Sequence, residues 1–112
     1  MKKFEEIIAW QKARLLTNLT YSLFRDCKDF SFRDQIQRAS VSIMNNIAEG
    51  FERDTDKDFR HFLFISKGSC GEVRSMAYLA SDLGYISDED YKKIAEYTND
   101  TSALLHGFIR KL

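Results

Sequence analysis

The stretch from Gln35 to Gly50, QIQRASVSIMNNIAEG, decides the fold of this chain. It contains no proline, and at about 100° per residue its apolar side chains fill a helical arc of roughly 200°. The members of this arc are Ile36, Ala39, Val41, Ile43, Met44, Ile47, Ala48 and, just beyond the stretch, Phe51. A surface helix needs an apolar stripe of only about 100°. We therefore expect this segment to be covered on two sides and to be the most buried helix of the molecule.

The glycine at the end of the stretch has two interpretations. Gly50 could end the helix as a left-handed cap, but the apolar line through Met44 and Ala48 continues to Phe51. We therefore extend the helix to about Arg53 and interpret Gly50 as a point where another segment packs closely.

Capping signatures mark the start of the central helix and of two further helices, and a glycine closes the first of these two. A Ser/Thr-x-x-Asp signature marks a helix start, and it begins at Ser31, Thr55 and Ser87. The helix after Thr55 should end at Gly84. An earlier helix is expected over Glu5–Asp26, with glutamates at its positive end.

Each of these helices carries an apolar stripe for the core. The stripes are Ile8, Leu15, Leu19 and Leu23 with Trp10, Ala13 and Phe24 on the first helix; Phe59, Phe62, Leu63, Val73, Met76, Ala80 and Leu83 on the third; and Tyr91, Ile94, Thr98, Thr101, Leu105, Phe108 and Leu112 on the fourth. Turns of about two to five residues force sequential helices to run antiparallel. The sequence thus predicts an all-α, antiparallel, up-down-up-down, left-handed four-helix bundle, with residues 1–112 as a single domain.

Composition narrows the classes of function. The 17 Lys and Arg residues are balanced by 17 Asp and Glu residues, which weighs against a dedicated nucleic-acid binder. No apolar run follows the first lysines, and no segment has the 18 apolar residues of a membrane span. The isolated Cys27 and Cys70 are typical of reduced, buried thiols. We expect a cytoplasmic protein that contacts no membrane.

Metal and cofactor chemistry has no visible motif. Helical di-iron sites need Glu-x-x-His pairs, and no glutamate here has a histidine three residues later. His61 and His106 each lack a second histidine at helical spacing. No glycine-rich phosphate loop is present either. We expect no cofactor and no metal.

Three surfaces remain as candidate sites, and the first is a polar arc on the central helix. Arg38, Ser42, Asn45 and Glu49 lie within about 60° of one another on this arc, beside Asn46. The arc is either an interaction or acid–base site or a solvated face with Glu49 and Arg53 as an i,i+4 pair. Periodicity alone favours the solvated face.

The other two surfaces lie on the third helix. Arg60, Lys67 and Arg74 recur every seven residues and form a line about 21 Å long, which could follow a phosphate backbone or be merely solvated. The balanced charge favours the solvated alternative.

The outward face of the same helix combines apolar and small residues, namely Phe64, Gly68, Gly71, Ser75 and Leu79. Two glycines inside a helix cost about 1 kcal/mol each, so close approach of another backbone would compensate for them. An outward surface of this kind favours oligomerisation over a ligand site.

Several segments together resemble a known family. They are Phe4 with Trp10-Gln-Lys-Ala13, the block Gln35-x-x-Arg38-Ala39-x-x-Ser42-Ile43-x-x-Asn46-Ile47-Ala48-Glu49-Gly50, Phe59-x-x-Phe62-Leu63 with Lys67-Gly68-Ser69 and Glu72, and Leu83-Gly84-Tyr85. In these the chain is similar to the bacterial four-helix-bundle family named for proteins encoded in 23S rRNA intervening sequences. The accessory protein of diversity-generating retroelements is a relative of that family. The similarity covers nearly the whole chain.

The resemblance implies a homopentameric ring without known catalytic activity. For the retroelement relative it implies binding to nucleic acid and to a reverse transcriptase through a basic surface. It also implies a structural or interface role for Arg38, Asn46 and Glu49.

Our leading hypothesis is a non-enzymatic, homo-oligomeric accessory or binding module, with RNA or a protein as its partner. The alternative is an enzyme that uses a polar cleft around Arg38, Asn46 and Glu49.

Overall fold

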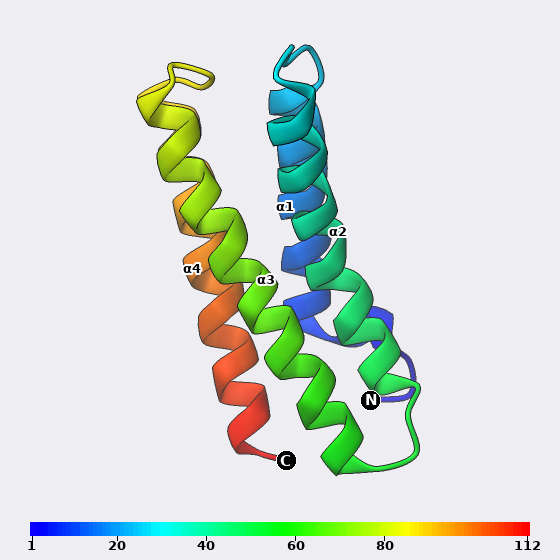
Figure 1. Ribbon diagram of the computed structural model, residues 1–112. Coiled ribbons are helices and arrows are strands. Elements are labelled where there is room, and N and C mark those ends of the chain that lie inside the picture. Colours follow the sequence, from blue (N-terminus) through cyan, green and yellow to red (C-terminus); the bar gives the residue numbers. More distant parts are fainter.

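The computed structural model describes all 112 residues and contains four long helices and no strand. The helices are preceded by one 3₁₀ turn, η1 (Phe4–Glu6), and their bounds are α1 (Ile8–Phe24), α2 (Phe30–Phe51), α3 (Asp56–Asp82) and α4 (Asp88–Arg110). The all-α class and the four-helix bundle are confirmed (Figure 1). None of the helices combines the length and the apolar content that crossing a membrane requires.

The helices form an elongated bundle of 43 × 21 × 19 Å in which neighbours in sequence are neighbours in space. α1 contacts α2 and α4, and α3 contacts the same two helices, so α1 and α3 occupy opposite corners. Both chain termini lie at one end of the bundle, as four antiparallel helices require (Figure 1). α1 and α3 therefore expose separate surfaces of the subunit.

Two of the three predicted caps are confirmed. The Thr55 hydroxyl accepts a hydrogen bond from the backbone N–H of Asp58, and the Ser87 hydroxyl accepts one from that of Asp90, each at 3.1 Å. The third prediction, a cap at Ser31, is wrong. α2 begins at Phe30, so Ser31 lies inside its first turn, and the cap is Asp29, whose carboxylate also suits the positive end of the helix.

The first helix is shorter than predicted. Ile7 has extended backbone angles, φ −74° and ψ 119°, and separates η1 from α1. This break accompanies nearly complete burial of the Ile7 side chain, which is 1% exposed. The Phe4 ring, carried by η1, packs against Trp10 with centroids 5.1 Å apart. A continuous helix from Glu5 to Asp26 is therefore wrong at both ends.

The apolar stripe predicted for α1 is only partly right. Ala13 and Phe24 are buried and Trp10, Leu19 and Leu23 pack against the core, whereas Ile8 and Leu15 are 55% and 50% exposed. The residues that α1 buries are Ala9, Ala13, Leu16, Thr17, Thr20 and Phe24. This buried face combines small residues with the large Leu16 and Phe24. The position of Ile8 and Leu15 is therefore a poor guide to it.

The helix that decides the fold packs tightly but is not the most buried helix. α2 buries seven of its 22 residues, whereas α1 buries six of 17. The prediction for Gly50 is confirmed, because a Cβ built there would lie 2.8 Å from the Cβ of Phe62 and 2.9 Å from Cδ1 of Phe59. Only a glycine allows α2 and α3 to come this close.

The remaining stripes largely agree with the sequence. Leu83 is an exception, being 51% exposed just after the end of α3. Gly84 follows with a φ of +72°, the left-handed conformation expected of a glycine that closes a helix. On α4 the predicted stripe faces the core, joined by Ile109.

Buried hydroxyl groups join the helices across the core. The hydroxyls of Thr20 on α1 and Ser40 on α2 lie 2.8 Å apart. The Ser66 hydroxyl on α3 donates to the carbonyl of Ile43 on α2 at 2.7 Å. No buried side-chain nitrogen or oxygen lacks a hydrogen-bond partner. These bonds fix the relative height of neighbouring helices, which apolar packing alone leaves less strictly defined.

Candidate functional site

The predicted interface residues on α3 are all exposed. Phe64 and Leu79 are 54% and 46% exposed, and Gly68, Gly71 and Ser75 lie between them. A Cβ built on Gly68 or Gly71 would have no atom of the chain within 4 Å. We call these five residues the α3 outer face. Its apolar ends and small centre have no partner inside the subunit.

A second apolar surface lies on α1 and consists of residues that were predicted to lie in the core. Ile8 and Leu15 project outward at the corner of the bundle opposite α3. Beside them runs a groove of about 550 Å³ between α1 and α4, whose apolar lining includes Met1, Ile8 and Leu104. The seven-residue spacing of Ile8 and Leu15 was visible in the sequence. It is a repeat typical of helix–helix contact, but it does not reveal whether the contacting helix belongs to the same subunit.

The polar arc on α2 divides into two parts, of which the first contacts α3. Ser42 and Asn46 are half-buried. The Ser42 and Ser69 hydroxyls lie 2.9 Å apart, and Asn46 Nδ2 donates to the carbonyl oxygen and the hydroxyl of Ser42 at 2.8 and 2.9 Å. Ser42 therefore links α2 to α3, and Asn46 holds the Ser42 side chain from within α2.

The second part of the arc consists of charged side chains that face outward. Arg38 is exposed, with no carboxylate oxygen within 4.0 Å. Glu49 is exposed as well and pairs with Arg53 at 3.8 Å, as its i,i+4 spacing predicts. Arg38 borders a shallow cleft with Tyr21 and Asp34, whereas Glu49 borders none of the five principal clefts. Neither charge finds a partner on a neighbouring helix of the subunit.

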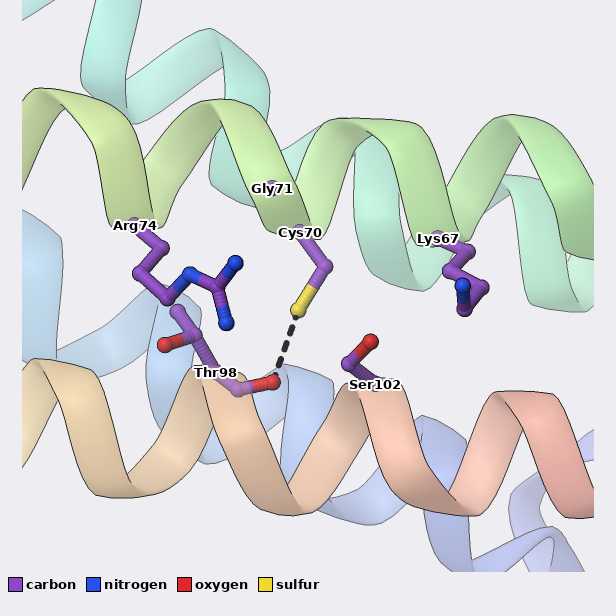
Figure 2. A pocket seen from close by; sticks show the side chains of 6 residues that line it. All are labelled: Lys67, Cys70, Gly71, Arg74, Thr98 and Ser102. Atoms are coloured by element: carbon purple, nitrogen blue, oxygen red, sulfur yellow. Dashed lines mark hydrogen bonds between the residues drawn. The ribbon is translucent and has the colours of Figure 1, made fainter.

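The basic line on α3 is also divided. Arg60 is exposed near the start of the helix. Lys67 and Arg74 both border a cavity between α3 and α4, and Arg74 Nη1 donates to Asn99 Oδ1 at 2.9 Å (Figure 2). The residues that complete this cavity, Thr98 and Ser102, come from α4. No sequence pattern links them to the basic line, so the cavity was not predicted.

Comparisons with known proteins agree with this architecture. No curated protein matches the chain. A crystal structure of a protein of unknown function from the S23 ribosomal protein family of Bacteroides thetaiotaomicron matches with a TM-score of 0.82 and 27% sequence identity. The match covers 92% of this chain and 96% of that one. The family model described as 23S rRNA-intervening sequence protein matches residues 5–107. The chain therefore belongs to the 23S rRNA-intervening sequence protein family.

Proposed function

We propose that this protein is a non-enzymatic accessory module that assembles with copies of itself into a ring and binds its partner as that ring. The observation that carries the proposal is the pair of exposed apolar surfaces on diagonally opposite helices. These are the α3 outer face and the Ile8–Leu15 surface of α1.

A ring of more than two subunits needs two different contact surfaces on each subunit, because each interface is heterologous. The two surfaces here differ and lie on diagonally opposite helices. We propose that Ile8 and Leu15 of one subunit pack over Gly68 and Gly71 of the next, where the absence of side chains leaves room. Full burial of a large apolar side chain contributes about 1.5–3 kcal/mol. A ring of five is the size implied by the family resemblance.

Partner binding is proposed for the exposed polar surface that the ring leaves free. Arg38 is available there, since it is exposed and no carboxylate oxygen of its own subunit lies within 4.0 Å. Nucleic acid or a reverse transcriptase is the partner class that the resemblance implies. With equal numbers of acidic and basic residues, direct RNA binding by one subunit should be weak. A ring multiplies such contacts through avidity.

The ring is tested by light scattering on the purified protein. The wild type should have a mass near five times 13.1 kDa at micromolar concentration. Phe64→Glu and Ile8→Glu each place a charge in one of the two proposed surfaces and should give monomers. Phe30→Glu is the matched control, because Phe30 is 61% exposed at the start of α2 and belongs to neither surface.

A monomeric wild type contradicts the proposal, and so does an assembly that survives both substitutions. A stable dimer would exclude the ring of five but keep the interface. The enzyme alternative needs a second titratable group in a cleft with Glu49, and the only ion pair of Glu49 is with Arg53 on the same helix.

A further inference from the structure

The cavity between α3 and α4 brings together polar groups that the proposed assembly does not use. It has a volume of about 140 Å³, and its lining consists of Lys67, Cys70, Gly71, Arg74, Thr98 and Ser102. In Figure 2 the side chains of Lys67, Cys70 and Arg74 extend from α3 toward α4, and Ser102 extends toward them from α4. Two of the six residues are cations and none is acidic.

Neither cation is neutralised within the subunit. No carboxylate oxygen lies within 4.0 Å of Lys67 or Arg74. Arg74 commits Nη1 to the amide oxygen of Asn99, and a guanidinium group has five N–H donors. The other four are free to point at a ligand. The ammonium group of Lys67 adds three donors, and the half-buried Ser102 hydroxyl adds one.

The floor of the cavity is neutral and fixed. Cys70 is 1% exposed, and its thiol donates to the carbonyl oxygen of Thr98 at 3.1 Å. Burial raises the pKa of this thiol to about 11, although Arg74 and Lys67 act in the opposite direction. The thiol therefore stays protonated at neutral pH and does not compensate the two positive charges.

We propose that this cavity binds one phosphate-type oxyanion, with Lys67, Arg74 and Ser102 as its donors. Charge-assisted hydrogen bonds from lysine and arginine are the strong contacts that such an anion makes in proteins. A cavity of about 140 Å³ has room for a tetrahedral anion together with water. Gly71 leaves its own part of the wall open.

The anion can come from two sources with the same chemistry. It is either free inorganic phosphate or one phosphodiester of an RNA strand that crosses the mouth of the cavity. All the donors belong to one subunit, so the site is complete without the proposed ring. Gly71 belongs both to the cavity wall and to the α3 outer face, so phosphate binding is measured on the monomeric Phe64→Glu variant as well as on the wild type. Failure of the ring would leave the site intact, and failure of the site would leave the ring intact.

Sodium phosphate is the first probe, with sodium chloride keeping the ionic strength constant. The unfolding midpoint of the wild type should rise with phosphate concentration, because a ligand that binds only the folded state stabilises it. Lys67→Met removes a charged donor and should weaken phosphate binding, measured by calorimetry, by about tenfold or more. Arg60→Gln is the matched control, a basic residue on the same helix outside the cavity, and should bind phosphate like the wild type.

A second variant keeps the test decisive if Lys67→Met folds poorly. Ser102→Asp places a carboxylate beside the two cations, where it should occupy the position of the anion. This variant should be at least as stable as the wild type without phosphate and should gain nothing from phosphate. A wild type that phosphate does not stabilise overturns the proposal. Equal phosphate effects in wild type, Lys67→Met and Ser102→Asp overturn it as well.

A uridine dodecanucleotide distinguishes the two sources. If a phosphodiester is the ligand, the oligonucleotide should compete with phosphate and should lose affinity in Lys67→Met and Ser102→Asp. If free phosphate is the ligand, both variants should bind the oligonucleotide like the wild type while losing phosphate. Either result supports an oxyanion site and identifies its occupant.

Discussion

The Tyr85 hydroxyl donates a 2.7 Å hydrogen bond to Oδ2 of Asp29 and so joins the turn after α3 to the turn before α2. The other oxygen of the same carboxylate, Oδ1, accepts the backbone N–H of Phe32 at 3.2 Å and caps α2. The hydrogen bond from Tyr85, followed by that from Phe32, lowers the pKa of Asp29. The carboxylate in turn raises the pKa of Tyr85. One side chain thus serves both as a helix cap and as a link between two turns.

The first prediction concerns the pH dependence of this link. Because the pKa of Asp29 is lowered in the folded state, its ionised carboxylate stabilises the fold above the usual pKa of 3.8. This contribution is lost as the pH falls through the folded-state pKa. Because the pKa of Tyr85 is raised in the folded state, its protonated hydroxyl stabilises the fold below the usual pKa of 10.0. This contribution is lost as the pH rises through the folded-state pKa. Tyr85→Phe should therefore lower the unfolding midpoint most between these two limits.

The measurement is thermal unfolding of wild type and Tyr85→Phe across that range of pH. Tyr21→Phe is the control, because Tyr21 is an exposed tyrosine on α1 whose hydroxyl makes no hydrogen bond in the subunit. A difference between wild type and Tyr85→Phe that stays constant from acid to alkaline pH would show that the ionisation of these two groups is not involved.

The second prediction tests the close approach of α2 and α3. Gly50→Ala should destabilise the fold by about 1–3 kcal/mol through overpacking, because its Cβ would lie 2.8 Å from the Cβ of Phe62. Gly107→Ala on α4 is the matched control. No atom lies within 4 Å of the added Cβ there, so the higher helix propensity of alanine should stabilise the fold by up to about 1 kcal/mol. Urea unfolding measures both, and a stabilised Gly50→Ala would refute the packing argument.

The third prediction concerns the two thiols. Cys27 is half-buried, whereas Cys70 lies at the floor of the cavity with its pKa raised to about 11 by burial. An alkylating reagent at neutral pH should therefore modify one thiol per chain quickly, and Cys27→Ser should abolish that fast reaction. Cys70 should react only when the protein unfolds. Two fast thiols in the native wild type would mean that the floor of the cavity opens readily.

The fourth prediction concerns Glu49. Its pair with Arg53 is exposed on both sides, and exposed pairs contribute less than about 1 kcal/mol. A Glu49→Ala variant that loses substantially more stability, or that dissociates the ring, must have lost a contact with another subunit. We expect this result in calorimetry and light scattering. Unchanged stability and assembly with loss of a measurable turnover would instead support the enzyme alternative.

The fifth prediction concerns RNA. Binding to single strands weakens with salt in proportion to the number of phosphate contacts, with a slope of about −0.7 per contact. Three basic residues per subunit, namely Arg60, Lys67 and Arg74, predict a slope of about −2 for one subunit. Fluorescence anisotropy with a labelled oligonucleotide measures this slope, and Arg60→Gln should make it shallower by one contact. Tight, sequence-specific binding that salt does not weaken would contradict the prediction.

The sequence was sufficient for the fold because its signals were local. Helical periodicity and turn length determine a four-helix bundle without knowledge of packing, and Thr55 and Ser87 cap the helices that they precede. At α1 the local signal was ambiguous. Apolar residues surround much of the helix, and two of those predicted for the core, Ile8 and Leu15, face outward.

The candidate site shows the same limit of sequence information. The exposure of the α3 outer face was predictable because its residues lie on the side of the helix away from the predicted apolar stripe. The cavity was not predictable, since it depends on how α4 is aligned along α3, and this alignment places Ser102 beside Lys67 and Arg74. Alignment between helices follows from the packing of many side chains and has no local signature.

Both chain termini leave the bundle at one end, while the turns joined by Tyr85 and Asp29 lie at the other (Figure 1). Any tag or fused protein, on either terminus, is therefore tethered to the same end of a body 43 Å long. The end formed by the turns stays free of such attachments. When the protein is immobilised through a tag on either terminus, this free end faces the dissolved binding partner. The same surface-binding experiment can therefore be used for every variant described above.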